Sequence, residues 1–121
     1  MTLPKIDPTT TKAWRELAAH YETLQHTTLK ELFAKDSSRA ETFSIQWQEF
    51  YVDYSKNNID ATTKKLLLDL AKEVQLDSAM KSYFGGEIIN ETEGRAVLHT
   101  ALRAPSTANI QYISDSTSTS D

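Results

Sequence analysis

The chain has 121 residues, and its 39% of hydrophobic and 25% of charged residues are typical of a folded globular protein rather than of a wholly disordered chain. Its 13 Lys and Arg residues against 17 Asp and Glu residues give a formal net charge of −4, which argues against the broad basic surface of a nucleic-acid-binding protein. The chain has no cysteine, so disulfides and thiolate chemistry are excluded.

Neither a secretion signal nor a membrane span is predicted. Residues 1–11 lack the apolar segment and the cleavage pattern of a signal peptide. The longest aliphatic run is Leu66–Leu68, far short of the roughly 20 residues that cross a membrane. We therefore expect a soluble, cytoplasmic protein with no membrane and no nucleic-acid partner.

A long helix is the first predicted element, over residues 10–34. The run Thr9–Thr11 supplies candidate caps, and Pro8 restricts the chain before them. Apolar side chains then recur at spacings of three and four. They are Trp14, Leu17, Tyr21 and Leu24, continued by Leu29, Leu32 and Phe33. A break around residues 26–28 is the alternative to one continuous helix.

A β-hairpin follows in the pattern. Residues 43–47 alternate apolar with polar side chains, which is the period of a half-buried strand. Residues 50–54 are rich in aromatic and β-branched side chains, which favours a second strand. Gln48 and Glu49 form the intervening turn, although this pair is weak turn chemistry.

Two further helices are predicted before the glycine pair. Asp60 is placed to cap a helix whose apolar stripe runs to Val74. A shorter helix follows, with Asp77 as its cap and with Met80 and Phe84 on its inner face. Gly85 or Gly86 ends it, where a left-handed residue is needed.

The last predicted helix covers residues 93–103. Asn90 and Glu93 have the spacing of a capping box, with Thr92 as the alternative cap. Pro105 ends the element, because the residue before a proline avoids helical geometry. Beyond it, residues 106–121 end in a run of Ser, Thr and Asp without an apolar side chain, so we expect a flexible tail.

Several residue sets could carry chemistry, and each has a structural alternative. His20 follows Glu16, and His26 follows Glu22, by one helical turn, which could give a metal or acid–base pair but is frequent on solvated helix faces. Gly85 and Gly86 lack the remainder of a phosphate-binding motif and are interpreted as a helix end.

An anion site is a second candidate, because a helix over residues 93–103 would align His99 with Arg95 and Arg103. Structural ion pairs with acidic groups are the alternative for these arginines. The aromatic segment could stack bases but has few basic neighbours, so a hairpin packed on the helices is preferred; its members are Trp47, Phe50, Tyr51 and Tyr54. From the residues alone we predict no catalytic, cofactor-binding or metal-binding residue.

Three ordered blocks carry a family resemblance that runs from about Trp14 to Pro105. They are Tyr54–Asn57, Phe84–Glu87 and Ile89–Arg103. Together they resemble the amino-terminal region of the glucose-6-phosphate isomerase family. The resemblance implies an α+β, mostly helical fold for residues 1–105, with amino-terminal helices and a short β-hairpin that belong to a larger enzyme with α/β sugar-isomerase domains. It also implies that residues 106–121 diverge from the family.

The same resemblance implies a function. The family interconverts glucose 6-phosphate and fructose 6-phosphate, without a cofactor or a metal, as a homodimer when full length. Its base glutamate, its ring-opening histidine and lysine and its phosphate loop belong to later domains. The chain is therefore expected to be an inactive amino-terminal fragment with a supporting role. In isolation its helices are expected to expose apolar patches. Glu93, Arg95 and Arg103 are expected to form ion pairs with the missing segments. The alternative is a noncatalytic helical interaction module that binds a partner through the stripe from Trp14 to Leu24.

Overall fold

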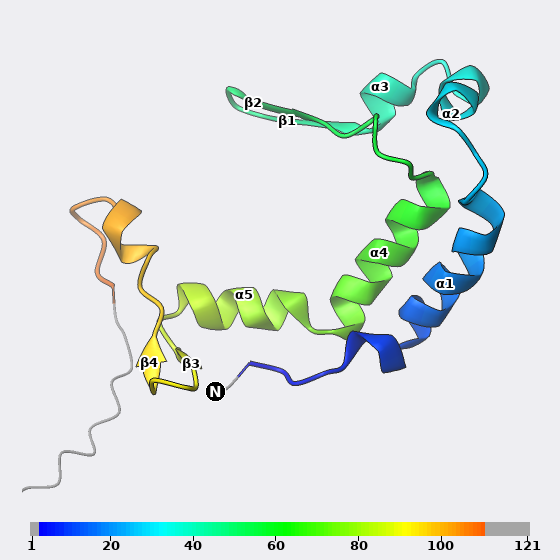
Figure 1. Ribbon diagram of the computed structural model, residues 1–121. Coiled ribbons are helices and arrows are strands. Elements are labelled where there is room, and N and C mark those ends of the chain that lie inside the picture. The colour runs from blue at the N-terminus through cyan, green and yellow to red at the C-terminus, as the bar shows by residue number, and fades with distance from the viewer. Residues whose placement is uncertain (1–2, 111–121) are drawn as a thin grey trace, which may run out of the picture. The chain divides into compact units, whose positions relative to one another are not determined.

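The computed structural model describes residues 3–110 and is mostly helical, with two antiparallel sheets of two strands each (Figure 1). This confirms the predicted α+β class. The chain divides into two compact units. The central unit is Thr9–Leu70, and the flanking unit joins residues 3–8 to residues 71–110 within the described part of the chain.

The predicted first helix is two helices, which confirms the alternative with a break. After a short 3-10 turn, Pro8–Thr10, α1 covers Lys12–Leu24 and α2 covers Leu29–Lys35. The Thr11 hydroxyl accepts a hydrogen bond from the Trp14 amide and caps α1. Thr28 and Glu31 form a complete capping box that starts α2. The break thus has a local cause, because a second helix start is encoded at Thr28.

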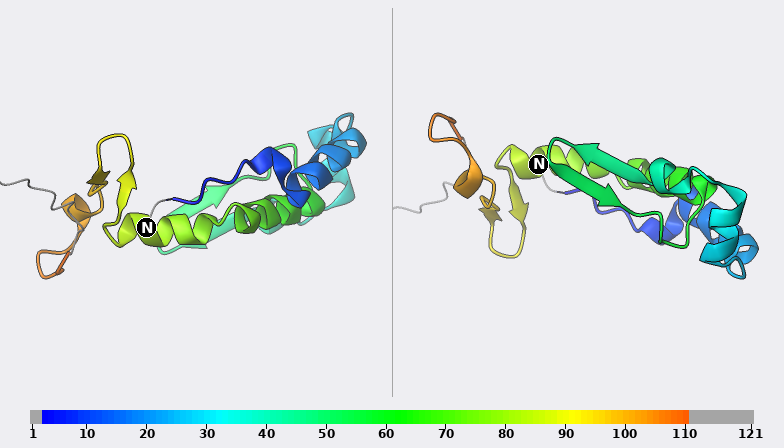
Figure 2. Two further views of the ribbon diagram at one scale, coloured as in Figure 1. Left: turned by 90° about the horizontal axis from the view of Figure 1, so that it is seen from below. Right: turned by 90° about the horizontal axis from the view of Figure 1, so that it is seen from above.

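The first hairpin is confirmed. A short helix, α3 (Arg39–Thr42), precedes it and was not predicted. Strands β1 (Ser44–Trp47) and β2 (Phe50–Asp53) pair in register from Ser44 with Asp53 to Trp47 with Phe50, and they run side by side in Figure 2. Gln48 takes a left-handed conformation with φ 51°, which is how a turn without glycine closes this hairpin.

A small apolar core lies in the central unit. Its buried members are Ala13, Leu32, Phe43 and Leu66, which come from α1, α2, the residue after α3, and α4 (Ala61–Glu73). The predicted packing of the hairpin on the helices holds only at its base, where Phe43 is buried and the Tyr54 hydroxyl accepts a hydrogen bond from Lys64 of α4. The large apolar side chains within β1 and β2 are all more than half exposed. The apolar stripe of α1 is also only partly covered, with Trp14 and Tyr21 exposed.

The α4 helix is confirmed together with its cap, since the Thr63 amide donates to Asp60 Oδ1 at 2.7 Å. The next helix, α5, covers Leu76–Phe84. Asp77 is not its cap, because the left-handed Gln75, at φ 57°, is the N-cap and the helix starts two residues earlier than predicted. Its supposed inner face is wrong as well, since Met80 is 47% and Phe84 68% exposed.

The glycine pair ends α5 as predicted. The Gly85 amide donates to the Lys81 carbonyl, and Gly86 takes the left-handed conformation with φ 72°.

The predicted helix over residues 93–103 is wrong. In its place, β3 (Ile88–Asn90) pairs with β4 (Arg95–Ala96), and a 3-10 turn covers Ala101–Arg103. Gly94, at φ 63°, closes the turn between these strands. The Glu93 amide does donate to Asn90 Oδ1, at 3.3 Å, but this bond closes the β3–β4 turn rather than capping a helix.

The predicted flexible tail over residues 106–121 lies mostly outside the described residues. Within the described part, the Ala108 amide donates to the Pro105 carbonyl at 2.9 Å and forms a turn.

Candidate functional site

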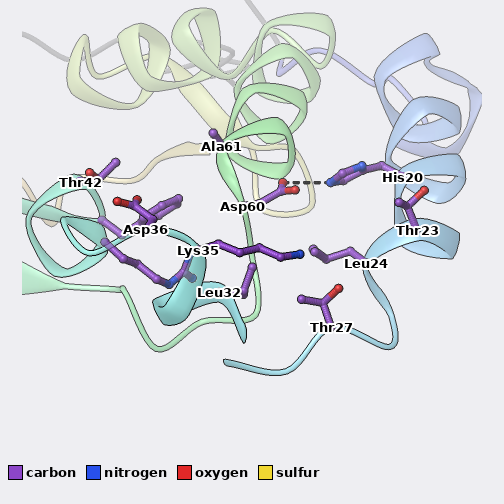
Figure 3. Close-up of a pocket in the computed structure, with 12 residues that line it drawn as sticks. His20, Thr23, Leu24, Thr27, Leu32, Lys35, Asp36, Thr42, Asp60 and Ala61 are labelled. Atoms are coloured by element: carbon purple, nitrogen blue, oxygen red, sulfur yellow. Dashed lines mark hydrogen bonds and ion pairs between the residues drawn. The ribbon is translucent and has the colours of Figure 1, made fainter. Parts of the chain in front are cut away.

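A cavity of about 380 Å³ in the central unit is the first candidate site (Figure 3). Helices α1, α2 and α3 and the start of α4 contribute its walls. Its lining residues are His20, Thr23, Leu24, Thr27, Leu32, Lys35, Asp36, Arg39, Thr42, Phe43, Asp60 and Ala61.

His20 and Asp60 join two helices at this cavity. His20 Nε2 lies 2.9 Å from Asp60 Oδ1, as the dashed line in Figure 3 marks. The same carboxylate accepts hydrogen bonds from the amide and the hydroxyl of Thr63. Burial raises the pKa of the Asp60 carboxyl, but the bonds from Thr63 and His20 outweigh it, so the pKa lies below its usual range. Asp60 is therefore an ionised cap that ties α1 to α4.

Arg39 is the most buried charged group of the cavity, with 2% of its surface exposed. Its Nε donates to the Ser55 carbonyl at 2.9 Å, and its Nη2 donates to the Asn57 and Ile59 carbonyls at 2.9 and 2.8 Å. The guanidinium carbon also lies 4.4 Å from the centre of the Phe43 ring. Arg39 therefore fixes the backbone of residues 55–59.

Arg39 thereby supports one of the sequence blocks that carried the resemblance. Ser55, the second residue of Tyr54–Asn57, is 1% exposed, and its amide donates to Asp53 Oδ1. Hydrogen bonds from the Ser55 hydroxyl and amide hold the pKa of the Asp53 carboxyl below its usual range. Lys64 Nζ donates to the Tyr54 hydroxyl at 2.6 Å. The backbone of the block is thus held as a turn, with Ser55 buried and with Lys56 and Asn57 exposed.

The structure separates the proposed histidine–glutamate pairs. Glu16 pairs with Lys12 at 3.1 Å, and Glu22 accepts from the Gln25 side chain at 2.9 Å. His20 turns to Asp60 instead, and His26 is exposed. Within residues 3–110 no cluster of three or more His, Cys, Asp or Glu side chains has the arrangement of a metal site.

A second cavity, also of about 380 Å³, lies in the flanking unit. Its lining residues are Tyr83, Phe84, His99, Thr100 and Arg103. Two members of the predicted anion site thus meet here. Arg95 does not line this cavity, because it lies on β4 opposite Asn90 rather than one helical turn before His99. The three-cation arrangement is therefore wrong, since the helix on which it depended does not form.

The glycine pair that was weighed as a phosphate-binding loop has a structural role. Gly85 and Gly86 end α5. Next to them, the Ser82 hydroxyl donates to Glu87 Oε2 at 3.0 Å, which ties α5 to the start of the second hairpin.

Arg39 is the residue that sequence reasoning missed. Its carbonyl partners lie 16 to 20 residues further along the chain, so no local spacing indicates it.

Comparison with known proteins matches the chain to a family model and to curated relatives. The sequence model of the phosphoglucose isomerase family matches residues 53–120. The glucose-6-phosphate isomerase of Christiangramia forsetii is 55% identical over 109 residues, which cover 90% of this chain and 20% of that relative. The chain therefore spans about a fifth of the length of the curated relative it matches.

In the described part of the chain, no helix is both long and apolar enough to span a membrane.

Proposed function

Since the chain belongs to the phosphoglucose isomerase family, we propose that it forms the amino-terminal part of a glucose-6-phosphate isomerase and that it supports the catalytic domains without taking part in the chemistry. The observation that carries this proposal is the 55% identity over 109 residues with a named isomerase. The substrates of the whole enzyme are then glucose 6-phosphate and fructose 6-phosphate. We expect that enzyme to be a cytoplasmic homodimer.

The supporting role follows from what the reaction requires. Proton transfer between adjacent sugar carbons needs a carboxylate base beside the substrate, and the phosphate needs several cationic or hydroxyl donors. In the central cavity the Asp60 carboxylate is engaged by Thr63 and His20, and the Arg39 guanidinium is engaged by three backbone carbonyls. These groups hold the fold and are not directed at a substrate.

A hybrid enzyme tests the family role. In it, the matching residues of this chain replace the corresponding 109-residue segment of the Christiangramia forsetii enzyme. We expect the hybrid to convert fructose 6-phosphate within about tenfold of the parent rate, a loss of about 1.4 kcal/mol in transition-state stabilisation. A hybrid that has the parent's circular dichroism but no activity would overturn the proposal.

The chain alone provides the complementary measurement. We expect no turnover by the purified 121-residue chain in a coupled assay. The control is a chain produced in a host that lacks its own isomerase. Turnover that survives this control would contradict the supporting role.

The interaction-module alternative is favoured by one observation, the exposure of Trp14 and Tyr21 on α1. A monomeric chain with a cooperative melt and no binding of a hydrophobic dye would support that alternative. Dye binding that the hybrid lacks would support the proposed enzyme part, because the rest of the polypeptide then covers the apolar surface.

A further inference from the structure

The central cavity has a polar rim and an apolar floor. At the rim, Lys35, Thr23 and Thr42 are exposed. At the floor, Leu32 and Phe43 are only 7% and 3% exposed. The volume of about 380 Å³ falls within the range of roughly 300–1,000 Å³ that is typical of small-molecule sites. The cavity therefore has the size and the polarity for a small ligand with one polar end and one apolar end.

The carboxylates that line this cavity are engaged by protein groups. Asp60 Oδ1 accepts hydrogen bonds from Thr63 and from the His20 ring. Asp36 Oδ1 accepts from the amide and the hydroxyl of Ser38, at 3.0 and 2.7 Å. A cationic ligand would compete with these bonds, which hold the ends of the helices.

The donors at the rim are available to a ligand. Within residues 3–110, neither the Lys35 ammonium nor the hydroxyls of Thr23 and Thr27 have a hydrogen-bond or ion-pair partner. Figure 3 shows the Lys35 side chain extending from α2 toward Leu24 and Thr27. An ammonium and hydroxyl donors that line one cavity suit a carboxylate or another small oxyanion.

The charges of the lining side chains do not oppose an anion. The cations Lys35 and Arg39 balance the anions Asp36 and Asp60 when His20 is neutral. Of the two cations, the Arg39 guanidinium donates to three backbone carbonyls. Lys35 therefore supplies the positive charge that a ligand can contact.

We infer that the central cavity binds a small organic acid, whose carboxylate contacts the Lys35 ammonium and the Thr27 hydroxyl and whose apolar body lies against Leu24 and Leu32. The charged end of the acid lies at the rim, in contact with water, and the apolar end lies toward the buried floor. This orientation keeps the charge out of apolar surroundings, where it would be costly. The inference goes beyond the proposed function and does not depend on it, because binding here requires no turnover.

Benzoate and benzamide are matched probes for this site, since they have nearly the same shape and only benzoate carries a charge. Ligand-observed NMR titration of the 121-residue chain measures the two dissociation constants. We expect saturable binding of benzoate in the millimolar range, because so small a ligand gains limited free energy from its few atoms. Benzamide should bind about tenfold more weakly, since it lacks the charge-assisted bond to Lys35.

Two lysines of α2 provide matched variants. Both are exposed, but Lys35 lines the cavity and Lys30 does not. Lys35→Met should weaken benzoate binding by about tenfold and leave benzamide binding unchanged, whereas Lys30→Met, with the same change of net charge, should weaken benzoate binding by less than about twofold. Thr27→Val keeps the shape of the side chain but removes the hydroxyl, and it should weaken benzoate binding by about threefold.

Several results would overturn the inference. They are an absence of saturable benzoate binding, equal affinities for benzoate and benzamide, and equal losses in Lys35→Met and Lys30→Met. In each case binding would not depend on a carboxylate at Lys35. Circular dichroism of the variants checks that a loss does not come from unfolding.

The hybrid enzyme separates this inference from the proposed function. Comparison of the hybrid with its Lys35→Met form removes the contribution of benzoate bound elsewhere. Binding that depends on Lys35 in the isolated chain but not in an active hybrid would overturn the inference, because the remaining polypeptide would then occupy the cavity. An inactive, folded hybrid would overturn the proposed function, whereas Lys35-dependent binding of benzoate to the chain would still support the inference.

Discussion

The central and flanking units are stabilised in different ways. The central unit buries four apolar side chains and a guanidinium that bonds to three distant carbonyls. In the described part of the flanking unit the buried residues are Ser82 and Gly86, and no large apolar side chain is fully buried. The first unit thus has a buried core with long-range hydrogen bonds, whereas the second has local turns and an ion pair between Lys5 and Glu91 at its surface.

Replacing Arg39 is the strongest way to test that difference. We expect Arg39→Met to lower the free energy of unfolding of the central unit by about 3 kcal/mol, because the Ser55, Asn57 and Ile59 carbonyls lose a charged donor. Both tryptophans, Trp14 and Trp47, lie in this unit, so tryptophan fluorescence during urea unfolding measures the change.

Arg39→Lys is the control, since it keeps the charge but not the planar fork that reaches three carbonyls. It should recover only part of the loss. Amide exchange at Ile88–Asn90 should be unchanged in both variants, since β3 is in the flanking unit. An Arg39→Met chain as stable as the wild type would show that the guanidinium does not hold the loop.

Asp60 gives a smaller effect that depends on pH. Asp60→Ala removes the α4 cap and should cost about 1 kcal/mol at neutral pH. The pKa of this carboxyl is lower in the folded chain than its unfolded value of about 3.9, so ionisation stabilises the fold above that value. The stabilisation is lost as the pH falls through the folded pKa.

Asp60→Asn separates the contribution of the helix cap from that of the negative charge, because Asn still caps a helix but carries no charge. The stability difference between wild type and Asp60→Asn should therefore be fully present above the unfolded pKa and should shrink below about pH 4. Urea unfolding at several pH values measures it. A difference that is constant over this range would contradict an ionised, stabilising Asp60.

Gly94 tests the flanking unit, and its replacement should cost no more than the loss of the Asp60 cap. Gly94→Ala places a side chain at φ 63°, with no heavy atom within 4 Å of the added Cβ, so its cost comes from the backbone alone. We expect a loss of about 1 kcal/mol, seen as faster amide exchange in β3 and β4, without a change in tryptophan fluorescence. Gly94→Asn should cost less, because Asn tolerates the left-handed conformation. An unchanged exchange rate in Gly94→Ala would mean that this turn does not limit the hairpin's stability.

The elements predicted correctly are those that neighbouring residues determine. The start of α1 follows from Thr11, whose side chain bonds within its own first turn, and the possible break near residues 26–28 coincides with the cap at Thr28. The α4 helix follows from Asp60 and its apolar stripe, and the first hairpin from a period of two. In each case the residues that indicate the element lie in it or within a few residues of its start.

The wrong predictions concern segments whose structure depends on contacts with distant residues or on the backbone conformation of a single residue. Asn90 and Glu93 have the same spacing in a capping box and in a hairpin turn, and the left-handed Gly94 selects the turn. The candidate anion site of His99, Arg95 and Arg103, which was weighed against structural ion pairs, fails with that helix. Arg39 could not be singled out, because its role depends on carbonyls that the fold brings from residues 55–59.

The pairing of β1 with β2 alone has a consequence for biosynthesis. In a sheet of two strands each strand is an edge, and its outward N–H and C=O groups can template further strands. Beside stacked aromatic side chains, such edges favour association between nascent chains. We therefore expect the open edges of this hairpin to promote association of the isolated chain as its concentration rises.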